Sequence, residues 1–191
     1  MKKATKIIIT IVVIIAIALA TAGIFILTNT KTSTKLGAIN SAEDLSTLVD
    51  KIYDGQAIRL PSLQTQIIDT TDDSWVQYTT GLENAKDIEY IVESEPMMTS
   101  QAYSLVLVKV KDGANADEIA KSMNEKINSR KWICVSAEKV YTTSSGNVVC
   151  LVMSSEANAK PIYEKFKELA GNIGKEYEKS EEEVELPPEM F

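Results

Sequence analysis

The stretch YSLVLVKV, residues 103–110, predicts a buried β-strand, because it is an almost unbroken apolar run rich in β-branched residues. Three further segments have a similar pattern and are predicted strands: Ile88–Glu93, Trp132–Tyr141 and Val148–Met153. The last two are joined by a Ser-Ser-Gly-Asn sequence that is typical of a hairpin turn, with Ser144 and Asn147 flanking a two-residue turn. These strands predict a mainly antiparallel sheet.

Three amphipathic helices are predicted around these strands. The first begins after Ser41, a good N-cap residue with Asp44 three positions on, and its apolar residues recur at helical spacing up to Asp54. The second follows Asn115 and ends near Ser129. The third covers Glu156–Ala170, and we expect its regular part to start at Asn158, so that Pro161 occupies the first turn. The order of elements predicts an α+β fold with the helices packed on one face of the sheet.

The segment between the first helix and residue 84 has the weakest pattern. Thr65–Asp69 and Ser74–Tyr78 are predicted as short strands around a polar turn. The predicted organisation of the whole chain is a membrane anchor at 1–28, a polar tether at 29–40, an α+β domain at 41–171 and an acidic tail at 172–191. The tail is expected to be solvated, because it is dominated by glutamate.

A membrane span is predicted near the amino terminus. Ile7 to Leu27 contains no charged residue and is long enough, at about 1.5 Å per residue, to cross the hydrocarbon core of a bilayer. Lysines are more frequent before this segment than after it, which favours a cytoplasmic amino terminus and an extracytoplasmic domain. The apolar run continues beyond Ala20-Thr21-Ala22, a possible cleavage site, so an uncleaved signal-anchor is favoured over a cleaved, secreted form.

The composition excludes several chemistries. The chain has 191 residues and no histidine, which removes the Ser-His-Asp and Cys-His triads and histidine-ligated zinc. The formal net charge of -7 argues against a nucleic-acid partner, since phosphate binding requires a basic surface. We expect no cofactor, and the expected partners are the lipid bilayer and an envelope protein or ligand.

Two groups of carboxylates are weak candidates for a site. Asp69, Asp72 and Asp73 carry the hard oxygen ligands that calcium prefers, but their spacing lacks the EF-hand pattern, and an ordinary acidic turn is favoured. Glu93 and Glu95 could perform acid–base chemistry if their environments separated their pKa values, although alternating glutamates on a solvated strand face are favoured.

Aromatic residues and cysteines supply the remaining candidates. Trp75 and Tyr78 could line a groove for a glycan or a peptide, although packing in the core is favoured. Cys134 and Cys150 are out of register for a disulfide across the predicted hairpin, so both are expected to be free and buried.

The chain resembles a bacterial family known as domain of unknown function 4358. The resemblance rests on Ser94-Glu95-Pro96-Met97-Met98, on AYSLVLVKVKDG at 102–113, and on the Arg130-Lys131-Trp132-Ile133 segment, and it covers roughly residues 44–169. It implies a small extracytoplasmic protein of a Gram-positive bacterium. This chain departs from the lipoprotein members because it has no cysteine for acylation near the apolar segment. The family has no established activity, so the resemblance implies no catalytic residue.

Together these observations predict a single-pass membrane protein whose extracytoplasmic domain is a non-enzymatic binding or assembly module of the bacterial cell envelope. The alternative is an extracytoplasmic enzyme that depends on carboxylates or on a metal.

Overall fold

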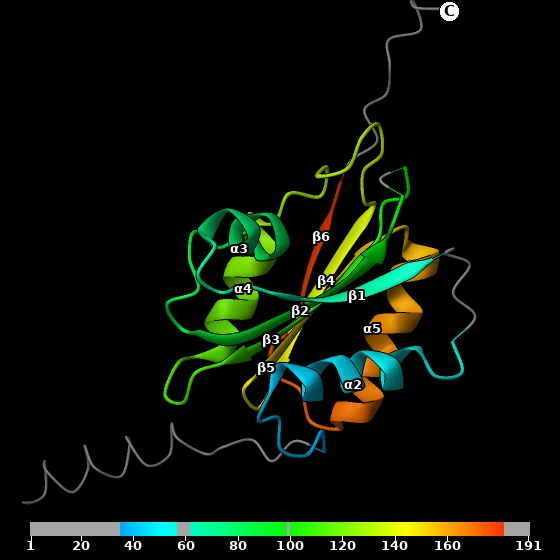
Figure 1. Ribbon diagram of the computed structural model, residues 1–191. Helices are drawn as coiled ribbons and strands as arrows, with labels where there is room; N and C mark the ends of the chain where they lie inside the picture. Colours follow the sequence, from blue (N-terminus) through cyan, green and yellow to red (C-terminus); the bar gives the residue numbers. More distant parts are fainter. Residues whose placement is uncertain (1–34, 57–61, 99, 182–191) are drawn as a thin grey trace, which may run out of the picture. The chain divides into compact units, whose positions relative to one another are not determined.

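The computed structural model describes residues 35–56, 62–98 and 100–181, and the predicted span Ile7 to Leu27 lies outside them. They form an α+β fold with one six-stranded antiparallel sheet, in which the strands lie in the order β1-β2-β3-β5-β4-β6. Four helices of the described residues accompany the sheet (Figure 1). Within the described part of the chain, no helix is long and apolar enough to cross a membrane.

The strand and helix bounds follow in chain order. The elements are α2 (Ala42–Tyr53), β1 (Leu63–Ile68), α3 (Asp73–Thr80), β2 (Ile88–Pro96), β3 (Ser104–Val110), α4 (Ala116–Lys126), β4 (Lys139–Ser145), β5 (Val148–Ser154), α5 (Glu156–Ala170) and β6 (Tyr177–Ser180).

The helices cover both faces of the sheet, so the prediction of a single covered face is wrong. Helices α2 and α5 pack on one face in a core that includes Leu105, Leu107 and Phe166. Helix α4 packs on the other face with Val106 and Val108, while α3 lies beside it (Figure 1). All of β3 and β5 is therefore buried, which is the reason for their continuous apolar sequences.

Local capping explains where the helices begin and end. Ser41 and Asp44 form the predicted capping box at the start of α2, and Asn115 accepts backbone hydrogen bonds at the start of α4. The expected extent of α5 and its end at Gly171 are confirmed. Its start is two residues earlier than Asn158, so Pro161 lies inside the helix rather than in its first turn.

Segment Ser74–Tyr78 was predicted as a strand and instead belongs to helix α3. The Asp72 carboxylate accepts hydrogen bonds from the backbone N–H groups of Ser74 and Trp75, which satisfies two of the donors that begin a helix. Gly81 ends α3 with a left-handed backbone, φ 78°. The two caps override a composition that is rich in strand-forming residues.

The predictions around β4 need two corrections. Residues 132–138 are irregular, and β4 begins only at Lys139. The hairpin turn consists of Gly146 and Asn147, because Ser145 lies opposite Val148. Gly146 has φ 60°, as the first central residue of a type II′ turn requires. The turn therefore lies one residue later than predicted, and the pairing of β4 with β5 is shifted accordingly.

The ends of the domain extend beyond the predicted bounds 41–171. Leu36 and Ile39, in the predicted tether, pack against the α2–α5 core. At the other end, Tyr177–Ser180 forms β6 on the outer side of β4, so the prediction of a solvated tail is wrong for these four residues. Backbone pairing with β4 and side-chain contacts along the segment compensate for its high charge. Residues 182–191 of the predicted tail lie outside the described part.

Candidate functional site

A buried ionic cluster joins two of the predicted site residues to a lysine. Glu93, on β2, is fully buried, and its carboxylate lies 2.6 Å from Lys131 Nζ, whose side chain is only 1% exposed. Lys131 Nζ also lies 3.6 Å from Glu95 Oε2. Because β2 side chains alternate between faces, Glu93 and Glu95 both point to the α3–α4 face, where the 127–138 segment brings Lys131 over them.

Hydrogen bonds occupy the remaining positions around Glu93. Ser104 Oγ donates to Oε1 at 2.9 Å, while Thr79 Oγ1 and Gln66 Nε2 lie 3.3 Å and 3.4 Å from Oε2. These donors come from β3, α3 and β1, so the carboxylate connects three elements besides its own. A buried carboxylate that is paired and hydrogen-bonded in this way is a stabilised charge.

Glu95 is less well compensated than Glu93. Its Oε2 is buried without a hydrogen-bond donor within range, and the ion pair with Lys131 is long. Burial raises the pKa of Glu95, the Glu93 carboxylate raises it further, and Lys131 and Trp132 only partly oppose these effects. The cluster therefore holds two carboxylates and one ammonium, and Glu95 is the group on which a proton would be taken up.

Both predicted aromatic candidates lie beside the same cluster. The Lys131 ammonium lies 4.4 Å from the centroid of the Tyr78 ring, a cation–π contact, and Trp75 packs edge-on against Tyr78 with 5.4 Å between centroids. Burial and the two glutamates raise the pKa of Tyr78 to about 12. The structure thus unites Glu93, Glu95, Trp75 and Tyr78, which the sequence presented as unrelated candidates.

Exposed hydrophobic side chains occur in the segments that carry the cluster. We call the following four residues the apolar rim: Trp75 (47% exposed), Met97 (70%), Met98 (53%) and Ile133 (68%). Trp75 contacts Tyr78, the methionines directly follow β2 beyond Glu95, and Ile133 lies two residues after Lys131. Large apolar side chains that stay exposed on a protein surface, when they form a patch, are typical of a binding site.

The aspartates at 69–73 lie just before α3 and at its first residue, and Asp69 and Asp72 have local structural contacts. The Asp69 carboxylate accepts hydrogen bonds from the N–H and hydroxyl of Thr71, which lower its pKa, and Asp72 caps α3. Among the residues that the structure describes, no group of three acidic or cysteine side chains is arranged to hold a metal ion.

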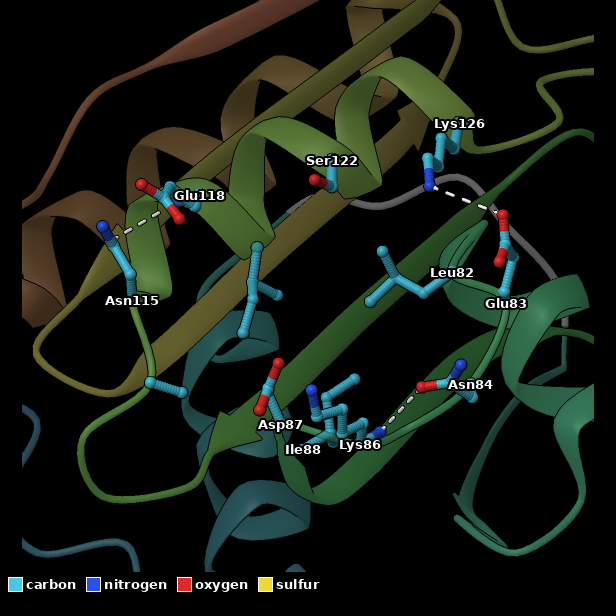
Figure 2. A pocket seen from close by; sticks show the side chains of 12 residues that line it. Leu82, Glu83, Asn84, Lys86, Asp87, Ile88, Asn115, Glu118, Ser122 and Lys126 are labelled. Carbon is cyan, nitrogen blue, oxygen red and sulfur yellow. Dashed lines mark hydrogen bonds and ion pairs between the residues drawn. The ribbon is translucent and has the colours of Figure 1, made fainter.

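A separate open pocket of about 370 Å³ lies between α4 and the segment that precedes β2 (Figure 2). Its lining carries charges of both signs, and Lys126 forms an ion pair with Glu83 across it at 3.9 Å. Asp87 and Ile88 line it at the start of β2, whereas Glu93 and Glu95 lie toward the other end of that strand. None of the predicted site residues lines this pocket.

Lys131, Ser104 and Thr79 were not predicted as members of the site. Lys131 is 38 residues from Glu93 in the chain, and no local spacing relates the two. One signal was available, because Glu93 directly follows the apolar pair Ile91-Val92 and Ser104 directly precedes the apolar run of β3. A buried polar residue of this kind requires a partner.

Both cysteines are free, as predicted, but they differ in exposure. Cys150 is buried and burial raises its thiol pKa, whereas Cys134 is exposed, contrary to the prediction that both are buried.

We expect the Cys134 thiol of the native protein to react rapidly with a maleimide and the Cys150 thiol to react only after unfolding. Mass spectrometry of the labelled peptides checks this, and rapid native labelling of Cys150 would contradict the structure.

The raised pKa of Glu95 predicts the pH dependence of stability. In the folded state the Glu95 carboxyl keeps its proton to a higher pH than in the unfolded state, where its pKa is the ordinary 4.5. The stability that results is therefore fully present below pH 4.5 and is lost as the pH rises through the raised pKa of the folded state. We therefore expect Glu95→Gln to stabilise the protein at pH 7 relative to the parent, with the difference shrinking toward pH 4. Urea unfolding at several pH values measures it, and a Gln variant that is less stable at pH 7 would contradict it.

No protein-family model, curated protein or solved structure matches the chain. The geometry of the cluster and its rim is therefore the basis for a functional assignment.

Proposed function

We propose that the chain is a single-pass, membrane-anchored binding module of the bacterial cell envelope, whose extracytoplasmic domain engages a partner protein through the apolar rim. The uncharged segment Ile7 to Leu27 and the lysines before it support the anchor and the orientation. The resemblance to domain of unknown function 4358 supports the same location and belongs to this proposal. The observation that carries the binding function is the exposure of Trp75, Met97, Met98 and Ile133, all in segments that also contribute to the buried cluster.

The buried cluster gives the rim a rigid base. Lys131 contacts Glu93, Glu95 and the Tyr78 ring, so it links the 127–138 segment to β2 and to α3. Since its ammonium is covered, it is not available to a substrate, and its contacts instead tie together the segments that carry Trp75 and Ile133. A binding surface whose anchors are already fixed loses less entropy when a partner associates.

The chemistry of the rim favours a protein segment over a glycan. Three of its four members are aliphatic or thioether side chains, which pack well against apolar side chains but offer no hydrogen bonds to sugar hydroxyls. Glu95, partly exposed, adds negative charge next to the rim in a chain whose net charge is -7. We therefore propose a partner segment that presents aliphatic side chains beside a lysine or arginine.

Site-specific photocrosslinking in cells tests this proposal. A photoreactive amino acid replaces Ile133 or Met97 in the full-length chain, and a matched control replaces Lys121, an exposed residue of α4. We expect the two rim positions to yield the same protein adduct, with the crosslinked peptide rich in aliphatic and basic residues, and the Lys121 position not to yield it. Identical adducts from all three positions, or none from the rim, would count against the proposal.

The alternative function is carboxylate-dependent catalysis, and the raised pKa of Glu95 is the observation that favours it. In this case Glu95 would be a general acid at the edge of the cluster. Glu95→Gln, which keeps the shape of the side chain, would then abolish turnover of an envelope substrate. If this variant complements a deletion as well as the parent does, the catalytic alternative fails, and so does the role of the Glu95 charge in partner choice, whereas the apolar contacts of the rim stay untouched by the result.

A further inference from the structure

Strand β1 forms one edge of the sheet and β6 forms the other. An edge strand presents unpaired backbone N–H and C=O groups, to which another strand can add. The two edges are differently protected. Strand β6 has four residues and carries the charges of Glu178 and Lys179, whereas β1 has six residues, Leu63–Ile68, and none of them is charged or proline. Only β1 lacks the features that discourage strand addition.

The pairing of β1 with β2 shows which backbone groups face outward. Pro96, which has no N–H, lies opposite Leu63, so these two residues form a pair without backbone hydrogen bonds. The neighbouring pair along the strands, Ser62 and Met97, is hydrogen-bonded, since Met97 N–H donates to Ser62 C=O at 3.2 Å. This agrees with the alternation of bonded and non-bonded pairs. By alternation, Gln64 and Gln66 bond to β2, and Leu63, Thr65 and Ile67 direct their backbone groups to the open edge.

The sequence LQTQII is complementary to itself when two copies run antiparallel. With Thr65 opposite the second copy's Thr65, Leu63 lies opposite Ile67 and Gln64 lies opposite Gln66. Leu63, Thr65 and Ile67, whose backbone N–H and C=O groups face the open edge, then each lie opposite a residue of the second copy with the same orientation. This is the condition for backbone hydrogen bonds between the two strands. No like charges face each other, and the Gln side chains can bond across the pair.

The exposure of β1 agrees with this arrangement. Ile67 is 52% exposed, and in the paired form it would lie against Leu63 of the second copy. Thr65 and Gln64 are also exposed, so neither has to leave a packed position to reach a second strand. We propose that two copies of the chain associate through antiparallel pairing of their β1 strands, with Thr65 on the two-fold axis, which joins two six-stranded sheets into one.

This inference is independent of the proposed function, because β1 contributes no residue to the apolar rim. The dimer could form whatever the rim binds, and the rim could bind a partner if the chain were a monomer. The tests are therefore separate. Photocrosslinking at Ile133 and Met97 addresses the rim, whereas the association of two copies addresses β1.

Cysteine crosslinking tests the register of the pair. The full-length chain, with Cys134→Ser to remove the exposed native thiol, is co-expressed with two different epitope tags. Thr65→Cys in both copies should give disulfide-linked dimers under mild oxidation, because residues opposite each other in an antiparallel pair have Cα atoms about 5.5 Å apart. Gln64→Cys in one copy should crosslink to Gln66→Cys in the other, and Gln64→Cys in both copies should crosslink several-fold less.

A charge variant and a control complete the test. Thr65→Lys places two ammonium groups on the axis while leaving the β1–β2 hydrogen bonds intact, and we expect the fraction of dimer in chemical crosslinking of the full-length chain to fall at least several-fold. Lys121→Cys, exposed on α4, reports the background of random collisions. If Thr65→Cys forms no more dimer than Lys121→Cys does, or if it crosslinks to a different protein in place of a second copy, the proposal is overturned.

Discussion

Replacing Lys131 with Met should destabilise the protein by about 3–5 kcal/mol, because it removes the ammonium and leaves the buried Glu93 carboxylate without its counter-ion. The hydrogen bonds from Ser104, Thr79 and Gln66 remain, but they do not neutralise the charge. The free energy of unfolding of a domain of this size is about 5–15 kcal/mol, so this single change would remove a large part of that stability. Urea unfolding followed by circular dichroism measures the loss.

Two further variants make the Lys131 prediction specific. Lys121→Met removes an exposed lysine whose ion pair with Glu125 spans 3.7 Å, and its effect should stay within about 0.5 kcal/mol. The double variant Lys131→Met, Glu93→Gln removes both charges and should recover part of the lost stability, which also provides a measurable protein if the single variant does not fold. A loss below about 1 kcal/mol for Lys131→Met would show that Glu93 does not carry a buried charge.

Replacing Gly81 with Ala should destabilise the protein by about 2–4 kcal/mol for two combined reasons. The left-handed backbone, φ 78°, disfavours any residue with a Cβ atom by about 1 kcal/mol. In addition, a Cβ here would lie 2.4 Å from the backbone nitrogen of Ile127 and 2.6 Å from the carbonyl carbon of Lys126, so the end of α4 would have to move. The expected readout is a lower urea midpoint.

Gly113 provides the matched control for Gly81. Its backbone is also left-handed, φ 89°, but nothing lies within 4 Å of the position that a Cβ would occupy. Gly113→Ala should therefore cost only the backbone strain, about 1 kcal/mol. The difference between the two variants measures the close approach of α3 and α4, and equal losses would mean that this contact carries no energetic weight.

The sequence predicted the elements whose signals are local. The capping box at Ser41 and the apolar run at 103–110 are local patterns, and both elements were confirmed. The α+β class and the antiparallel sheet followed from them. The same apolar run also contained the evidence for helices on both faces, because a strand that is covered on one side only would alternate with polar residues.

The missed features depend on contacts between distant parts of the chain. Helix α3 has a strand-like composition, and its helical state depends on its two caps and on packing at Gly81. Strand β6 is short and highly charged, and it is ordered by pairing with β4. The candidate site was predicted in pieces, since Glu93, Glu95, Trp75 and Tyr78 were identified separately. Lys131, which unites them, lies in an irregular segment for which periodicity gives no information.

The position of β6 has a consequence for synthesis of the protein. Strand β4 pairs with β5 on one side, and in the described part of the chain its other side pairs with residues 177–180, which are translated after every other strand of the sheet. Until they emerge from the ribosome, the nascent domain exposes an unpaired β4 edge, which can pair with another chain and promote aggregation. A premature stop codon shortly after Gly171 would arrest the protein in that state, whereas one after Glu181 would leave the sheet complete.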